Sequence, residues 1–182
     1  MAASNKTPNE AIDSAHSSHF SPESYVTLLV GSNEQKMIAY GSHLARDSDF
    51  FAAAMKKEWV EGQTRTIKLP EECPAIMAHY LSYLYSGKLF TEDIKSVPGE
   101  EILPCFQLLA SLCVACERFL NTELQFKILA EIRRLYFTPD RDAKYWYPTP
   151  EAIAIIYDGT PGGSQCRRLL VEMHVGSSEL SW

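Results

Sequence analysis

The spacing of apolar residues predicts a short β-sheet near the start of the chain. Residues 25–30 are rich in β-branched and aromatic strand formers, residues 31–33 (Gly-Ser-Asn) supply a turn, and residues 36–40 have the composition of a returning strand. Polar and apolar residues then alternate over 64–69, and Pro70 ends this third strand. The pattern therefore predicts a β-hairpin and one further strand.

Helical spacing of apolar residues predicts most of the structure that follows. Ser42 can cap a helix that runs to about Lys57, and a second helix begins at Pro74 and ends at Gly87. A third helix is expected over 102–119. A fourth carries apolar residues on one face, namely Leu124, Ile128, Leu129, Ile132 and Leu135.

The last part of the chain predicts two more helices. Thr149 and Pro150 are typical of a helix start, and Gly159 lies near the end of that helix. Residues 161–163 (Pro-Gly-Gly) break it, and a final helix over about 164–175 is expected to bury three side chains, Leu169, Leu170 and Met173. The predicted fold class is α/β (α+β), a short sheet with a cluster of α-helices and a C-terminal helical extension.

Residues 1–22 differ from the rest in being rich in serine and poor in large apolar side chains. Such a segment buries too little apolar surface to offset the entropy lost on ordering. We therefore expect a disordered N-terminal arm that is dispensable for folding. The arm also has no apolar run of signal-peptide length, which favours a cytoplasmic or nuclear location.

Composition narrows the classes of partner. The 182 residues are 46% hydrophobic, enough for a core without disulfides or metal ions, and the formal net charge is −6. An acidic chain with scattered basic pairs is a poor binder of phosphate backbones, so a nucleic-acid partner is not expected. No stretch approaches the roughly 20 apolar residues that span a bilayer, so no membrane partner is expected either.

Five cysteines, an odd number, are expected to stay reduced in that compartment. Cys113 and Cys116 form a lone Cys-x-x-Cys motif, whereas a structural zinc site usually combines two such pairs. The simplest interpretation is that both side chains pack as small apolar groups one helical turn apart. No metal ion is predicted.

The sequence contains no recognised catalytic motif: no Gly-x-Ser-x-Gly elbow, no His-Glu-x-x-His pair and no phosphate-binding glycine loop. We therefore predict that the protein is not an enzyme and needs no cofactor. One alternative from another class is a small thiol-dependent enzyme that uses Cys113 or Cys116. A lowered thiol pKa with solvent access would support that alternative, and burial of both side chains would exclude it.

Trp59 and Val60 are unusual because they lie in a short charged connection between the first helix and the third strand. Two interpretations are open. The Trp59 ring can fold back onto the core, or it can anchor a partner protein, since tryptophan is enriched at binding hot spots.

Several motifs in this order resemble those of BTB/POZ domains. The resemblance covers about residues 24–135 and is carried by six segments: residues 26–31, 44–51, 59–62, 67–70, 80–89 and 109–124. It implies a BTB/POZ domain over 23–136. Residues 137–182 resemble the helical extension of stand-alone fungal BTB proteins.

This resemblance implies a protein–protein interaction module that self-associates as a homodimer. In many members of the family the module also acts as a substrate adaptor for a cullin ubiquitin ligase. Cullin-binding members share a hydrophobic-x-Glu motif, which Trp59-Val60-Glu61 fits, so these three residues are the predicted partner site. The arm lacks the apolar stripe of an exchanged helix, so we expect side-by-side dimer packing through Phe50 and Phe51.

Two positions depart from the family pattern. Tyr25 stands where an aspartate usually precedes the first strand, and Asp47 stands where a basic residue usually precedes Ser48. In transcriptional-repressor members these positions form a charged pocket. The alternative function of a transcription-associated scaffold is weakened by that difference, and by the absence of a DNA-binding motif from the sequence.

Overall fold

The computed structural model describes residues 25–91, 102–139 and 143–179. The predicted arm, residues 1–22, lies outside these ranges. Three strands form one sheet in the order β2-β1-β3, with β1 (Tyr25–Val30) antiparallel to β2 (Gln35–Tyr40) and parallel to β3 (Thr66–Leu69). The three predicted strands are confirmed.

Strand β1 is central because it pairs with both β2 and β3, and its alternation places every second side chain in the core. Val26, Leu28 and Val30 have no exposed surface, while the side chains between them are partly or fully exposed. The hairpin turn needs a left-handed residue at Gly31, whose φ is +76°, a value that glycine adopts without steric cost. The turn and the alternation together set the register of the sheet.

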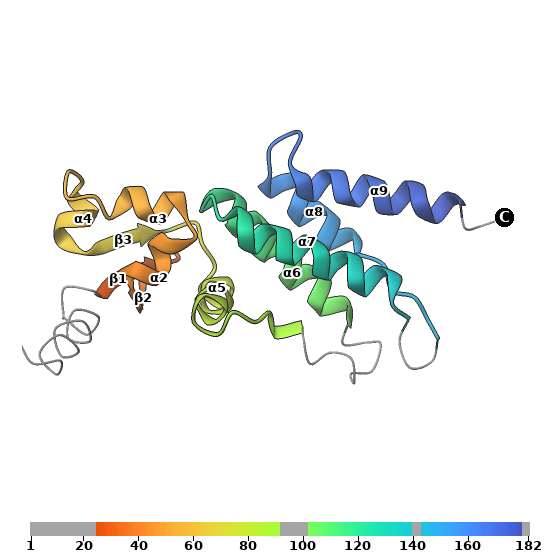
Figure 1. Ribbon diagram of the computed structural model, residues 1–182, viewed down its shortest axis with the longest axis horizontal. Coiled ribbons are helices and arrows are strands. Elements are labelled where there is room, and N and C mark those ends of the chain that lie inside the picture. Colours follow the sequence, from red (N-terminus) through yellow and green to blue (C-terminus); the bar gives the residue numbers. More distant parts are fainter. Residues whose placement is uncertain (1–24, 92–101, 140–142, 180–182) are drawn as a thin grey trace, which may run out of the picture.

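Eight helices complete the described part of the chain (Figure 1). Their bounds are α2 (Gly41–Arg46), α3 (Asp49–Ala54), α4 (Val60–Thr64), α5 (Pro74–Ser86), α6 (Ile102–Arg118), α7 (Thr122–Phe137), α8 (Pro150–Gly159) and α9 (Gln165–Glu179). In Figure 1 the sheet and α2–α4 lie at the left, α6–α9 stack at the right, and α5 lies between them. The fold class is therefore confirmed as mixed α/β, a small sheet with many helices.

The single helix predicted from Ser42 to Lys57 is wrong: the structure has two short helices there, α2 and α3. Ser48 separates them because its hydroxyl oxygen caps α3, accepting a hydrogen bond from the Phe51 N–H at 3.2 Å. The same hydroxyl donates to the Phe119 carbonyl at 2.5 Å. Because the Ser48 hydroxyl bonds both a free N–H at the start of α3 and a distant carbonyl, a break at this position is favoured over a continuous helix.

A cluster of buried rings joins the two ends of the molecule. The Phe51 ring lies 4.9 Å from Phe119 and 6.2 Å from Tyr80, and Tyr80 lies 5.1 Å from Phe119, between ring centroids. These rings come from α3, from α5 and from the end of α6. Asn121 supports them by donating to the Tyr80 hydroxyl at 3.0 Å while capping α7 through the Leu124 N–H.

The predicted C-terminal helices are also present, and they belong to the same core as the rest. Leu169, Leu170 and Met173 of α9 are buried, as predicted. Gly159 brings α8 against α6 so closely that an added Cβ would lie 2.5 Å from the Val114 side chain. Within the described residues, none of the helices is both long and apolar enough to cross a membrane.

Candidate interaction surfaces

The Trp59 turn, defined as residues 55–62 between α3 and the middle of α4, presents two large apolar side chains to solvent. Trp59 is 58% exposed and Val60 is 69% exposed. The interpretation that the Trp59 ring folds back onto the core is therefore wrong. The two exposed side chains are adjacent in sequence and together form a small apolar patch on the surface.

The backbone of this turn is tightly defined. The Trp59 N–H donates to the Lys56 carbonyl at 3.0 Å, and the Gln63 side chain donates to the Lys57 carbonyl at the same distance. Gly62 packs directly on that backbone, because a Cβ there would lie 2.1 Å from the Lys56 carbonyl oxygen. A side chain at position 62 would therefore require the backbone at Lys56 to shift.

Glu61 lies in the first turn of α4, next to the two exposed apolar side chains. Its side chain is partly buried, unlike those of its neighbours. The predicted partner site, Trp59-Val60-Glu61, is thus one continuous stretch in which an aromatic anchor is flanked by a carboxylate. A carboxylate in a helix's first turn is favourably placed toward the helix dipole.

The predicted self-association pair needs a correction. Phe51 is fully buried in the ring cluster, so its side chain has no surface with which to contact a second chain. Phe50 is partly buried and packs 5.1 Å from Phe51 and 5.7 Å from Phe119, between ring centroids. The sequence pattern could not separate the two rings because the break at Ser48 changes which face of α3 turns inward.

The expectation of five reduced cysteines is wrong for one pair, because the structure joins Cys113 of α6 to Cys166 of α9 in a disulfide. Cys116 is free but buried, and desolvation raises the pKa of its thiol. Neither residue of the Cys-x-x-Cys motif is an accessible thiolate. The hypothesis of a thiol-dependent enzyme is therefore contradicted by the criterion on which it rested.

A ring cluster at the hairpin edge was not anticipated from sequence. Tyr25 and Tyr40 share a hydrogen bond of 2.6 Å between their hydroxyls, and this bond raises the pKa of Tyr40. The Tyr85 hydroxyl accepts from the Tyr40 N–H at 2.9 Å and its ring lies 4.9 Å from the His43 ring. The cluster fastens β2 to α5, and it occupies the position where the family pattern has an aspartate.

Asp47, the second position that departs from the family pattern, is engaged locally. The Arg46 guanidinium lies 2.6 Å from the Asp47 carboxylate, whose side chain is only 13% exposed. A carboxylate covered by its own neighbouring arginine presents little charge to a partner. Within the described residues, no cluster of histidine, cysteine and carboxylate side chains is arranged to hold a metal ion.

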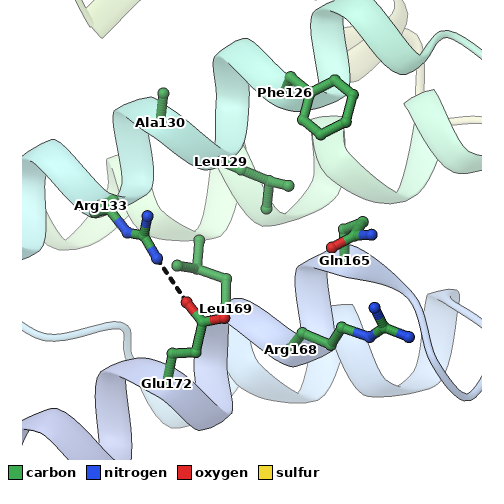
Figure 2. A pocket seen from close by; sticks show the side chains of 8 residues that line it. All are labelled: Phe126, Leu129, Ala130, Arg133, Gln165, Arg168, Leu169 and Glu172. Atoms are coloured by element: carbon green, nitrogen blue, oxygen red, sulfur yellow. Dashed lines mark hydrogen bonds and ion pairs between the residues drawn. The ribbon is translucent and has the colours of Figure 1, made fainter.

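An open groove of about 310 Å³ runs between α7 and α9 (Figure 2). Phe126 projects into it from α7 and is 62% exposed, and Leu129 and Leu169 form its apolar base. An ion pair of 2.5 Å between Arg133 and Glu172 closes one end, as the dashed line in Figure 2 shows. Phe126 does not belong to the apolar face predicted for this helix. Its position off that face is the feature of the sequence that indicates an exposed ring.

Comparison with known proteins gives a likeness at the level of structure and none at the level of sequence. No protein-family model matches the chain, and no curated protein sequence matches it. The structure is similar to the BTB (Tramtrack and Bric a brac) domain of human gigaxonin, with a TM-score of 0.42 and 15% sequence identity. The alignment covers 72% of this chain and 98% of the gigaxonin chain.

Proposed function

We propose that this protein is a non-catalytic protein-interaction module that binds a helical partner through the Trp59 turn. The observation that carries the proposal is the joint exposure of Trp59 and Val60, at 58% and 69%, on a hydrogen-bonded turn. A large exposed ring that needs no rearrangement loses little conformational entropy on binding. The turn is therefore suited to insert into an apolar pocket of another protein.

The partner we propose is the N-terminal helical domain of a cullin, with this protein as an adaptor of a ubiquitin ligase. Support comes from the fit of Trp59-Val60-Glu61 to the hydrophobic-x-Glu motif and from the helical extension that follows the BTB-like part of the chain. The motif places an apolar anchor and a carboxylate side by side, and the structure keeps both near the surface.

The two side chains are expected to contribute unequally. Truncation of a tryptophan that fills a partner's pocket costs about 2–4 kcal/mol, or roughly 30- to 1000-fold in affinity. A carboxylate at the rim stays hydrated and contributes about 0–1 kcal/mol. Trp59→Ala should therefore nearly abolish binding, while Glu61→Ala should weaken binding modestly and in a way that depends on salt.

Isothermal titration calorimetry of the full chain against a purified cullin N-terminal domain tests this proposal. Tyr145→Ala is the matched control, because Tyr145 is another exposed aromatic side chain, at 52%, in a different segment. Binding by wild-type protein and by Tyr145→Ala, with loss in Trp59→Ala, supports the proposal. Absence of heat from the wild-type protein at tens of micromolar overturns the adaptor function, and full affinity of folded Trp59→Ala removes Trp59 from the site.

We also propose self-association through the exposed side of α3. Phe50 is partly exposed there and Ala53 is exposed, so a second helix can approach the backbone closely at Ala53. Light scattering of the full chain should show a dimer, and Ala53→Glu should shift it to monomer by placing charges in the contact. A wild-type monomer at high micromolar concentration contradicts the proposal.

A further inference from the structure

A second open groove, of about 540 Å³, lies where the segment before α5 meets α6 and α8. We call it the acidic groove and define it by Glu71, Glu72, Glu151 and Asp158, which surround an apolar base that includes Ile155. The groove is separate from the Trp59 turn: α4 lies at the far left of Figure 1, and α8 lies among the helices at the right.

One face of α8 forms one wall of the acidic groove. Glu151, Ile155 and Asp158 are spaced four and three residues apart, so they fall on the same side of the helix. This side therefore offers a carboxylate at each end and an apolar side chain between them. Such an arrangement is complementary to a helix or extended segment in which apolar and basic residues alternate.

The rest of the lining comes from the segment before α5, from the first turn of α5 and from α6. Glu71 and Glu72 lie in the turn that leads into α5, and Ile76 and Val114 supply apolar surface between the walls. Gly159 holds α8 against α6 at Val114, where an added Cβ would lie 2.5 Å from the valine side chain. The base of the groove is therefore part of the packed core and keeps its shape.

The charge of the acidic groove is negative after its internal ion pair is counted. Among the residues described, one basic residue, Arg118, lines the groove. Its guanidinium lies 2.8 Å from the Glu72 carboxylate. Within the described residues no ion pair involves the three other carboxylates, Glu71, Glu151 and Asp158. Hydrogen bonds from the backbone and from Thr149 lower the pKa of Glu151, so this group is ionised at neutral pH.

We propose that the acidic groove binds an amphipathic, lysine- or arginine-rich segment of a partner protein. The occupant has to bring cations for the three carboxylates and apolar side chains for the base. The chain's own longer segments outside the described ranges cannot supply several cations. Residues 1–24 contain one lysine, Lys6, and no arginine, and residues 92–101 contain one lysine, Lys95, and no arginine. A second copy of a chain with net charge −6 brings no excess of cations to the three carboxylates of the groove.

Fluorescence anisotropy with a defined peptide tests this inference on the full chain. The probe is a labelled peptide of about four helical turns with lysine and leucine at amphipathic spacing, and its counterpart has glutamate in place of every lysine. The lysine peptide should bind and the glutamate peptide should not. Raising the ionic strength should weaken the binding, because exposed charges are screened within about 8 Å at physiological salt.

Charge-reversal variants locate the site. Glu151→Lys with Asp158→Lys should lower the affinity for the lysine peptide by about tenfold or more. Glu123→Lys with Glu172→Lys makes the same change in net charge on α7 and α9, whose described residues do not line the groove, and it should leave the affinity within about twofold. Equal weakening by the two double variants means that the peptide responds to net charge alone, which overturns the proposal.

A measurement on the wild-type protein keeps the test decisive if a reversed variant fails to fold. The lysine peptide should shift the methyl NMR signals of Ile76 and Ile155 and leave that of Ile38, which is exposed on the sheet, unchanged. Shifts at Ile38 without shifts at Ile76 and Ile155 overturn the proposal. Absence of binding, or equal binding of the glutamate peptide, also overturns it.

Discussion

The sheet end and the helical end of the molecule expose apolar side chains in different ways. At the sheet end, two apolar side chains, Trp59 and Val60, project from a single turn that also carries exposed charged side chains. At the helical end, apolar residues line grooves whose edges are charged, such as the Arg133–Glu172 pair beside the groove of Figure 2. At the sheet end most of the binding free energy is expected from one side chain, Trp59. At the helical end it is expected from several charged groups and from the shape of the groove.

This difference has consequences that can be measured. Binding through the Trp59 turn should depend mainly on the Trp59 side chain and fall only modestly as salt rises, because apolar burial is not screened and Glu61 contributes little. Binding through the acidic groove should depend on several carboxylates and fall as salt rises. Different contacts also maintain the two surfaces. The Trp59 turn depends on the packing of Gly62 against the Lys56 backbone, and the acidic groove depends on the packing of α8 against α6.

The largest expected effect separates a core ring from a surface ring within the sheet end. Phe51→Ala should lower the free energy of unfolding by about 3–5 kcal/mol, because it removes a fully buried ring from the cluster with Tyr80 and Phe119. Trp59→Ala, at a position 58% exposed, should change it by less than about 0.5 kcal/mol. Chemical denaturation measures both. Similar losses in the two variants would show that Trp59 also supports the fold.

A smaller effect is expected where the turn packs on itself. Gly62→Ala should cost about 1–3 kcal/mol, because its Cβ meets the Lys56 carbonyl, a backbone atom that cannot rotate away. Gly162→Ala is the control, since an added Cβ there meets nothing within 4 Å. Thermal unfolding measures the stability of both variants. An unchanged unfolding midpoint in Gly62→Ala would contradict the close packing of the turn.

The matching test at the helical end is Gly159→Ala. Its Cβ would meet the Val114 side chain at 2.5 Å, which should separate α8 from α6 at a cost of about 1–3 kcal/mol. Because this contact shapes the acidic groove, the affinity for the lysine peptide should fall while binding through the Trp59 turn is retained. Equal losses at both surfaces would show that the two ends are coupled.

The smallest effect concerns the thiols and leaves stability unchanged. In the folded protein a thiol-specific reagent should label Cys73, which is exposed, while Cys116 should react only after unfolding. Burial raises the pKa of Cys116, so a rise in pH within the neutral range should not expose it as a thiolate. Mass spectrometry of the labelled peptides assigns the sites. Rapid labelling of Cys116 in folded protein would reopen the thiol hypothesis.

Local pattern was sufficient for the strands and for the longer helices. The alternation over β1 and the spacing along α5, α7 and α9 each follow from burial of one face, which a period of two or of 3.6 residues records directly. The short helices α2 and α3 were merged into one, because the hydroxyl of Ser48 both caps α3 and donates to the distant Phe119 carbonyl, and this places the break there. That bond joins residues far apart in the sequence and leaves no periodic signal.

The sequence by itself determined that this chain folds as a small sheet with helices, and that Trp59, Val60 and Glu61 lie together in a connection between two elements. Only the tertiary structure decided that the Trp59 ring is exposed and the Phe51 ring buried, and that Cys113 pairs with Cys166. It also decided that carboxylates from the turn before α5 and from α8 surround one groove. The physical reason is that periodicity records which face of an element is buried, whereas exposure and proximity depend on which distant elements pack against that face.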